Sequence, residues 1–271
     1  MAKYTNFPFS PDIMQDGKAL QAGTSHFLGQ NFAKAFDVKF ANSEGKEDYV
    51  WATSWGVSTR LIGALIMTHS DNQGLVLPPR IAPLQVVIVP IYRSPEQFES
   101  VSHKANDIKK ILEEKGIRVK FDNDDTKKPG WKFNEYEMKG VPVRIAIGPK
   151  DIENESCEIA RRDTGQKETL SFNDVADHVL NLLVDIQENL FKRAKEFRNS
   201  NTFHASSYDD FKDRVKRGGF VSAYWNGDES IEEKIKQETK ATIRFIPLEQ
   251  KSGTCMISGE NGKLVYFAKA Y

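Results

Sequence analysis

Residues 84–121 read LQVVIVPIYRSPEQFESVSHKANDIKKILEEKGIRVKF, and this stretch decides the fold. Its first six residues are almost continuously apolar and rich in β-branched side chains, which is typical of a buried strand. The segment SPEQ at 94–97 then predicts a helix start, with Ser94 as N-cap, proline at the first helical position and Gln97 closing a capping box. The helix is expected to reach about Lys115 and to end at Gly116, a typical residue after a helix C-cap.

Residues 117–121 predict a second strand. A strand–helix–strand unit implies a right-handed crossover and a largely parallel sheet. The polar stretch 122–135 is interpreted as a loop followed by a short helical piece. Val141–Ile147 and Cys157–Arg161 predict further strands, and Ser171–Asp174 predicts the cap of a long helix. The apolar positions of that helix keep a spacing of three to four residues.

The regions on either side have different patterns. Upstream, residues 77–83 (LPPRIAP) hold three prolines in seven residues, which predicts a stiff connector and a domain boundary. Before it, Val50–Thr53 is interpreted as a strand and Ser58–Thr68 as a buried helix, although periodicity separates helix from strand poorly in such short apolar runs. The last section predicts a small α+β unit. Its expected helices begin at Ser207 and Glu229, and its expected strands are 242–246, 254–257 and 264–268.

Composition bounds the class of protein. A chain of 271 residues suggests about two domains, or three if each is small. With 38 basic and 38 acidic residues the net charge is zero, so no global field draws the protein to nucleic acid or membrane. Two cysteines argue against a disulfide framework and for a reducing compartment. No apolar run reaches about 18 residues and no secretory signal is visible, so a cytoplasmic protein without a membrane partner is expected.

Any contact with RNA must therefore come from local basic clusters. The alternative is that these clusters are ordinary solvated helix faces, which is the commoner case. The candidates are Lys127, Lys128 and Lys132; Lys192, Arg193, Lys195 and Arg198; and Lys212, Arg214, Lys216 and Arg217.

Two polar segments carry the chemistry. Residues 21–32 read QAGTSHFLGQNF and residues 53–60 read TSWGVSTR. In the second segment Gly56 stands four residues before Arg60, and an apolar run follows. A guanidinium at the start of a helix is planar, charged and bidentate, which suits a polyphosphate, and a glycine lets the backbone approach a ligand closely.

These segments resemble a known family. Gly56 to Arg60 looks like motif 3 of the class II aminoacyl-tRNA synthetases, and the pair of segments resembles prolyl-tRNA synthetases of the archaeal and eukaryote-like type. Residues 129–151 (PGWKFNEYEMKGVPVRIAIGPKD) resemble that family's anticodon-binding domain, and the terminal LVYFAKAY resembles its C-terminal ending. The resemblance covers roughly residues 14–271.

The resemblance implies a multidomain α/β and α+β fold. Residues 1–82 would be part of a class II catalytic domain with an antiparallel sheet. Residues 83–198 would form an α/β anticodon-binding domain with a mixed sheet, and residues 199–271 a small α+β C-terminal domain. Motifs 1 and 2 are not visible, so the chain is expected to be the C-terminal portion of a synthetase, with little activity alone. Whether it dimerises stays open, because motif 1 usually supplies the dimer surface.

By the same resemblance, Arg60 is the catalytic residue and reaches the γ-phosphate of ATP. Ser58, Gln21 and Thr24 are implied to bind ATP, with Gln21 helping to hold Mg²⁺. Without the resemblance, the spacing alone favours the alternative that Arg60 is an arginine at a helix start in a surface ion pair.

The amino-acid pocket is implied by four residues. His26 matches a position that contacts proline, and Ser54, Trp55 and Gly56 are expected to wall the pyrrolidine ring. Flat apolar walls with one or two polar anchors suit such a ligand. The alternative for His26 is a structural histidine with its hydrogen bonds satisfied.

Glu137 and Arg144 match positions that read guanines of the proline anticodon. The chemistry fits, because arginine binds guanine O6 and N7 in bidentate fashion and a carboxylate accepts from guanine N–H groups. The alternative is an ordinary ion pair. The nearby Trp131, Phe133 and Tyr136 are interpreted as core residues rather than stacking platforms.

Zinc is not expected. Relatives with zinc carry cysteine pairs where this chain has Asn226, Ile231, Cys255 and Ser258, and one thiolate cannot make a tetrahedral structural site. The leading hypothesis is an ATP-dependent proline–tRNA ligase with tRNA(Pro), proline and ATP as partners. The alternatives are a tRNA-binding accessory module and, with less support, a protein–protein adaptor.

Overall fold

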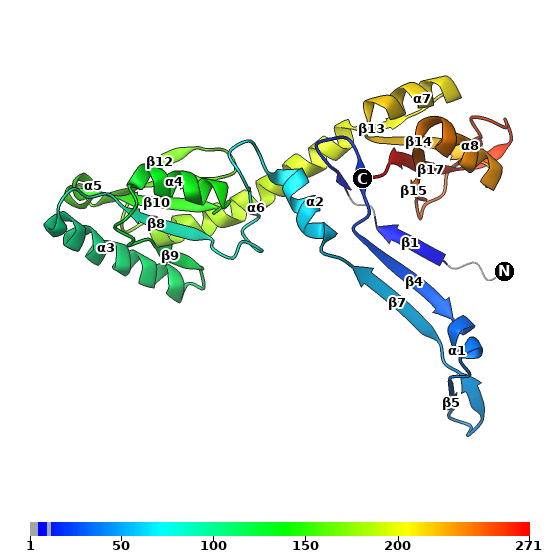
Figure 1. Ribbon diagram of the computed structural model, residues 1–271, viewed down its shortest axis with the longest axis horizontal. Coiled ribbons are helices and arrows are strands. Elements are labelled where there is room, and N and C mark those ends of the chain that lie inside the picture. Colours follow the sequence, from blue (N-terminus) through cyan, green and yellow to red (C-terminus); the bar gives the residue numbers. More distant parts are fainter. Residues whose placement is uncertain (1–4, 10–11) are drawn as a thin grey trace. The chain divides into compact units, whose positions relative to one another are not determined.

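The structure, a computed structural model, describes residues 5–9 and 12–271. The chain divides into two compact units. Figure 1 shows the elements of both units, coloured along the sequence. The first unit combines Met1–Thr68 with Lys195–Tyr271, and the second is His69–Ala194. The division into three domains at 82/83 and 198/199 stays a prediction.

The second unit is built on a five-stranded sheet. Its strands are β8 (Val86–Pro90), β9 (Val119–Phe121), β10 (Val143–Ile147), β11 (Ser156–Arg161) and β12 (Lys167–Ser171). The spatial order is β12-β11-β10-β8-β9. The β10–β8 and β8–β9 pairs are parallel, whereas β10–β11 and β11–β12 are antiparallel. The sheet is therefore mixed, as the resemblance implied. Strands β8 and β9 of the strand–helix–strand unit are parallel, whereas β11 and β12 are antiparallel, and β12 was not predicted.

Four helices accompany this sheet: α3 (Pro95–Glu114), α4 (Pro129–Met138), α5 (Pro149–Glu153) and α6 (Val175–Ser200). Val86 and Ile88 of β8 share a core with α3 and α6, while Val87 and Val89 pack with Tyr136 of α4 on the opposite face. Alternate side chains of a strand point to opposite faces, so both sets must be apolar when both faces are covered. This explains the continuous apolar run of β8.

The predicted boundaries of α3 are confirmed. The Ser94 hydroxyl accepts a hydrogen bond from the Gln97 backbone N–H at 3.4 Å, Pro95 opens the helix, and Gly116 has a φ of +78°. The reciprocal half of the capping box differs from the prediction. The Gln97 side chain accepts from the backbone N–H of Arg93 at 2.9 Å, one residue before the cap.

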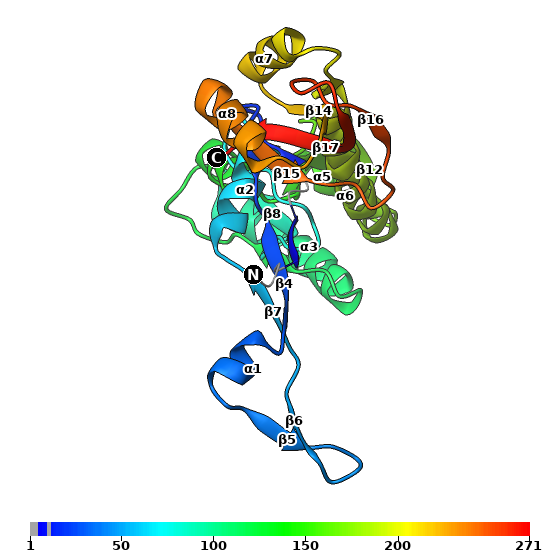
Figure 2. The same cartoon turned by 90° about the vertical axis from the view of Figure 1, so that its right-hand side faces the viewer.

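The N-terminal part of the first unit contains a three-stranded sheet of order β1-β4-β7. Figure 2 shows how β4 and β7 lead to α1 and to the β5–β6 hairpin. The elements are β1 (Thr5–Phe9), β2 (Asp12–Ile13), β3 (Ala19–Leu20), β4 (Gly23–Gly29), α1 (Asn31–Ala35), β5 (Lys39–Ala41), β6 (Glu47–Tyr49), β7 (Ala52–Val57) and α2 (Arg60–His69).

Helix α2 was expected to be buried, and this was wrong. None of its residues is fully buried, and Leu61, Ile62 and Ile66 are 39%, 61% and 40% exposed. The apolar pattern predicted the helix itself, but burial needs an opposing surface, and local sequence does not say whether one is present.

The C-terminal part of the first unit is an α+β layer, as predicted. Its sheet has the order β13-β14-β17-β15, and β16 pairs with β17. Strands β13 and β14 were not predicted, although β14 is central to the core. The elements are β13 (Thr202–His204), α7 (Tyr208–Arg217), β14 (Phe220–Trp225), α8 (Glu229–Thr239), β15 (Ala241–Phe245), β16 (Ser252–Thr254) and β17 (Asn261–Lys269).

Backbone contacts join the two parts of the first unit. The Gly219 N–H donates to the Gly17 carbonyl at 2.8 Å, and the Tyr271 N–H donates to the Ala19 carbonyl at 3.3 Å. A Cβ at Gly17 would lie 3.3 Å from the Cα of Gly218, so these two segments of the chain approach each other at glycines that have positive φ. Tyr271 is thereby held beside Ala19, which precedes Gln21 by two residues in the sequence.

Candidate functional site

The register of β4 and β7 brings the two polar segments together. Thr24 lies opposite Gly56 and His26 lies opposite Ser54. Directly opposed residues of an antiparallel pair share one face of the sheet. A Cβ on Gly56 would lie 3.2 Å from the Thr24 hydroxyl, so the missing side chain leaves that hydroxyl accessible. Four of the predicted ligand-binding residues therefore occupy one face.

The predicted ATP-binding residues meet at one end of this strand pair. Because Gly23 pairs with Val57, Gln21 before β4 and Ser58 after β7 lie beyond the same end. The Ser58 hydroxyl accepts from the backbone N–H of Arg60 at 3.4 Å, at the start of α2. His26 lies three residues beyond Gly23 along β4, which corresponds to about 10 Å at 3.3 Å per residue.

Trp55 does not share the face of His26. It lies opposite Ser25, its side chain is on the other face, and it is 80% exposed. The three residues expected to surround the pyrrolidine ring therefore do not share one face. Ser54 and Gly56 lie on the same face of the sheet as His26, and the Trp55 indole lies on the opposite face. Trp51 and Val57 are also exposed, at 62% and 74%. Exposed apolar surface of this extent is typical of a surface that contacts another polypeptide.

Glu137 and Arg144 come from different elements of the second unit. Glu137 lies one residue before the end of α4, and Arg144 lies in β10. Together with Tyr136, Val141, Ala160, Arg161 and Arg162 they line one small pocket of about 20 Å³. Such a volume holds about one water molecule, so the pocket is too small to enclose a base.

Arg144 is buried and contacts two side chains. Its side chain is 6% exposed, its Cζ lies 3.7 Å above the centre of the Phe133 ring, and its Nη1 donates to Glu158 at 3.4 Å. Burial lowers the pKa of the Arg144 guanidinium, and the carboxylates of Glu158 and Glu137 oppose that change. The Nε group is buried and has no hydrogen-bond partner among the described residues. An orphaned buried donor is costly, which marks Arg144 as a candidate ligand-binding group.

A buried polar cluster anchors α4 beneath this pocket. Lys132 is 2% exposed, and its Nζ donates to the Asp122 carbonyl at 2.8 Å and lies 3.4 Å from the Asp122 carboxylate. The Tyr136 hydroxyl donates to the same carboxylate at 3.0 Å. Burial and that carboxylate raise the pKa of Tyr136. Lys132 was considered as an RNA contact, and this was wrong because its ammonium is sequestered.

The three aromatics of α4 differ in environment. Tyr136 is buried and Phe133 is partly buried in the same small core, as expected. Trp131 is 49% exposed, so its assignment to the core was wrong, and the Lys127 ammonium lies 5.0 Å from its ring centre. An exposed indole on this helix is available to stack on a base.

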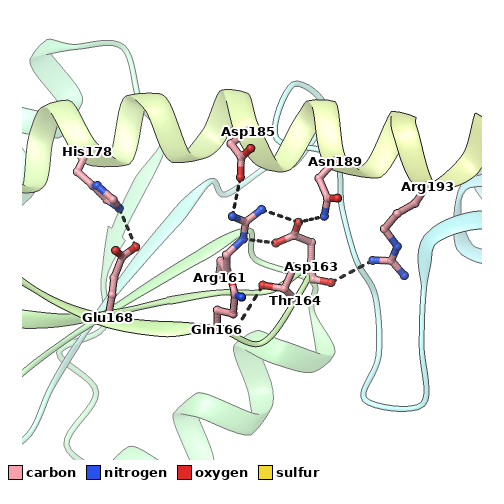
Figure 3. A network of polar contacts seen from close by, with 9 residues as sticks. All are labelled: Arg161, Asp163, Thr164, Gln166, Glu168, His178, Asp185, Asn189 and Arg193. Carbon is pink, nitrogen blue, oxygen red and sulfur yellow. Dashed lines mark hydrogen bonds and ion pairs between the residues drawn. The ribbon is translucent and has the colours of Figure 1, made fainter.

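A second polar network holds the β11–β12 turn against α6 (Figure 3). Arg161 donates to Asp163 at 2.7 and 2.8 Å and to Asp185 at 2.6 Å, and Asn189 donates to Asp163 at 2.6 Å. Burial would raise the pKa of Asp163, but the hydrogen bonds from Arg161 and Asn189 outweigh burial and lower it. The local sequence gives no sign of this network, because Asp185 and Asn189 lie more than 20 positions from the residues that they contact.

Several basic side chains of the remaining clusters have partners within the protein. On α7, Lys212, Arg214 and Lys216 pair with aspartates three or four residues earlier on the same helix. Arg193 of α6 donates to the Asp163 carbonyl at 3.0 Å. These contacts fit the alternative interpretation of solvated or structural helix faces.

At the compared zinc positions, the Asn226 side chain donates to Glu260 at 2.8 Å, and Ile231 packs against the core. Cys255 is buried. Burial opposes ionisation of its thiol, but hydrogen bonds from Ser258, Ile257 and Asn226 together lower the pKa of Cys255. Across residues 5–9 and 12–271 no group of three or more His, Cys, Asp or Glu could hold a metal ion. The absence of zinc stays a prediction.

Two family models match the chain. The family described as "Anticodon binding domain" matches residues 85–182, which contain the pocket of Glu137 and Arg144. The family described as "Prolyl-tRNA synthetase, C-terminal" matches residues 208–271. The chain therefore carries a region similar to the anticodon-binding domain and a region similar to the C-terminal part of prolyl-tRNA synthetases.

Whole-chain relatives point the same way. A protein named "Proline--tRNA ligase" from Porphyromonas gingivalis is 58% identical over 262 residues, which is 96% of this chain and 53% of that protein. Proteins of the same name from Christiangramia forsetii and Bacteroides fragilis are 58% and 56% identical, and 54% of each is covered. The chain thus spans about half the length of the curated relatives it matches. These relatives are bacterial, and the archaeal or eukaryote-like subtype stays a prediction. Within the described part of the chain, none of the helices is long and apolar enough to cross a membrane.

Proposed function

We propose that this chain is the C-terminal part of a cytoplasmic, ATP-dependent proline–tRNA ligase. In that reaction a proline carboxylate oxygen attacks the α-phosphorus of ATP and pyrophosphate leaves. A terminal hydroxyl of tRNA(Pro) then attacks the carbonyl of prolyl-adenylate, and AMP leaves. The observation that carries the proposal is 56–58% identity to proteins named proline–tRNA ligase across 96% of this chain. The joint placement of Glu137 and Arg144 in one pocket of the region matched by the anticodon-binding family supports the tRNA partner.

The first unit would supply half of the catalytic machinery. Arg60 is proposed to bind the γ-phosphate at the start of α2, with Ser58, Thr24 and Gln21 around the nucleotide. A fixed guanidinium accelerates such a reaction by positioning and by stabilising developing charge. Mg²⁺ is proposed to bind together with the phosphates of ATP, because this ion is usually held by substrate phosphates and few protein carboxylates.

Proline is proposed to lie against His26, Ser54 and Gly56 on one face of the β4–β7 pair. The exposed apolar side chains of β7 and α2 are proposed to contact the rest of the catalytic domain, which would also carry the homodimer surface. Trp55, on the reverse face, would then pack against that missing part rather than against the ring of proline.

The proposal is tested with the purified 271-residue chain. Proline-dependent ATP–pyrophosphate exchange should be close to background, because the resemblance finds no motif 2 arginine for the α-phosphate. Adding the N-terminal half of a related proline–tRNA ligase in trans should raise exchange, and R60A should remove the increase. Robust exchange by the chain alone would contradict this division of labour.

An alternative function is a tRNA-binding module without catalysis. One observation favours it: the two matched family regions cover residues 85–182 and 208–271, and neither reaches the β4–β7 segments. Full tRNA(Pro) binding with no rescue of exchange by any added N-terminal half would favour this module.

A further inference from the structure

The end of α4 that carries Glu137 is clamped by a buried arginine outside that helix. Arg162 follows β11 and its side chain is 5% exposed. Its Nε donates to the Glu137 carbonyl at 2.9 Å, and its two Nη atoms donate to the Asp71 carboxylate at 2.7 and 2.6 Å. Three donors of one planar group thus fix three atoms from two segments, a geometry that lysine cannot reproduce.

The clamp satisfies a need of the helix terminus. The last four carbonyls of an α-helix have no partner within the helix, and positive charge is favourable beside them. Here the Glu137 carbonyl accepts from Arg162 and from the Gly140 N–H, while the Met138 carbonyl accepts from the Leu75 N–H at 3.0 Å.

Close backbone packing reinforces this clamp. A Cβ on Gly74 would lie 2.4 Å from the Cα of Met138, and a Cβ on Gly140 would lie 2.7 Å from the Cβ of Leu75. Residues 71–75 therefore pack directly on the end of α4. Hydrogen bonds from Arg162 lower the pKa of Asp71, so the carboxylate stays ionised and the clamp stays charged over the neutral range.

We infer that Arg162, braced by Asp71, is a positioning residue for recognition of guanine by Glu137. It holds the main chain of Glu137 so that the carboxylate faces the same pocket as Arg144, without itself contacting the base. Arg144 belongs to β10, which is paired with β8 on one side and β11 on the other, so the relative placement of Glu137 and Arg144 depends on how the end of α4 is held. This inference rests on the proposed function of Glu137.

The test measures base discrimination by the full chain. The probes are a tRNA(Pro) transcript and the same transcript with inosine replacing each anticodon guanine in turn, which removes only the 2-amino donor. Good two-contact recognition of a base gives about tenfold or greater discrimination. The wild-type chain should bind guanosine about tenfold better than inosine at one position, and E137Q should reduce that ratio to about 1.

R162K is the decisive variant, and R118K is its matched control. Arg118 also donates to backbone carbonyls of the same unit, but those carbonyls belong to Pro79 and Ala82 and not to α4. R162K should reduce the guanosine-to-inosine ratio from about 10 to 3 or less, whereas R118K should leave the ratio unchanged even if it lowers stability. D71N, which keeps the size of the brace but removes its charge, should fall in between and covers the case in which R162K does not fold.

The outcomes separate the two claims. If E137Q abolishes discrimination while R162K and D71N keep the wild-type ratio, the positioning role is overturned and the function of Glu137 stands. If E137Q discriminates like wild type, the guanine-reading role fails, and the positioning role fails with it. If R118K lowers the ratio as much as R162K, the effect is general destabilisation and the inference is rejected.

Discussion

Replacing Lys132 by methionine should be among the most damaging single changes in the second unit. The side chain is 2% exposed, and its partner Asp122 is 6% exposed. Without the ammonium, the Asp122 carboxylate keeps only hydrogen bonds from the Tyr136 hydroxyl and from the Asp124 backbone N–H, at 3.0 and 3.1 Å. The Asp122 carbonyl, which accepts from Nζ at 2.8 Å, is left without that donor.

The magnitude follows from these contacts. Removing one partner of a buried ion pair costs about 3–5 kcal/mol, and the orphaned carbonyl lies within that sum. The matched control is K139M at the C-cap of the same helix, because Lys139 is 58% exposed and pairs with Glu135 four residues earlier. An exposed pair of this kind contributes about 0–1 kcal/mol. The double variant D122N/K132M should recover part of the loss, since no uncompensated charge stays buried.

The assay is urea unfolding of the full chain, with hydrogen exchange of peptides from β8, β10 and α4 reporting on the second unit. Those peptides should lose about 3–5 kcal/mol of protection in K132M and less than 1 kcal/mol in K139M. Equal losses in the two variants, or a double variant worse than K132M, would refute the account of a charge-compensated buried pair.

Two further predictions concern packing and pH. G74A should destabilise the second unit by about 1–3 kcal/mol more than G116A. Gly74 and Gly116 both have positive φ, but only a Cβ on Gly74 would meet backbone atoms, the nearest of them 2.4 Å away. Equal midpoints of the two variants in urea unfolding would contradict this. Burial, with a smaller effect of Asp151, raises the pKa of the Cys157 thiol to about 12. Its proton is retained in the fold, so this contribution to stability is full below the ordinary thiol pKa and falls as pH rises from about 9 toward 12. Iodoacetamide at pH 9 should therefore label Cys157 in urea but not in the native chain, as peptide mass spectrometry would show; equal labelling rates would count against it.

The local sequence was sufficient for elements whose ends are specified by neighbouring residues. Helix α3 is the clearest case, because Ser94, Pro95 and Gly116 act within one turn of its two ends. The strand β8 is another, since burial of both faces demands the apolar run 86–89 that the sequence shows directly. Strands β12 and β14 were missed. Lys167–Ser171 is polar and lies at a sheet edge. Phe220–Trp225 directly follows two glycines, which obscure its strand pattern in the sequence.

The candidate sites divide in the same way. Motif resemblance alone indicated Arg60, His26, Glu137 and Arg144, and the roles of these residues stay predictions. Only the tertiary structure placed Trp55 on the face opposite His26, because strand register decides which side chains share a face.

The sequence alone did not indicate which residues fix the candidate sites in place. Lys132 looked like part of a basic surface cluster, and Arg162 looked like one of two adjacent arginines. Their roles come from Asp122 and Asp71, which lie 10 and 91 residues away along the chain. Short-range patterns specify helices and strands because hydrogen bonding and side-chain periodicity act over a few residues. Whether a charge is buried, paired or exposed depends on which distant segment packs against it, and that was decided by the folded structure alone.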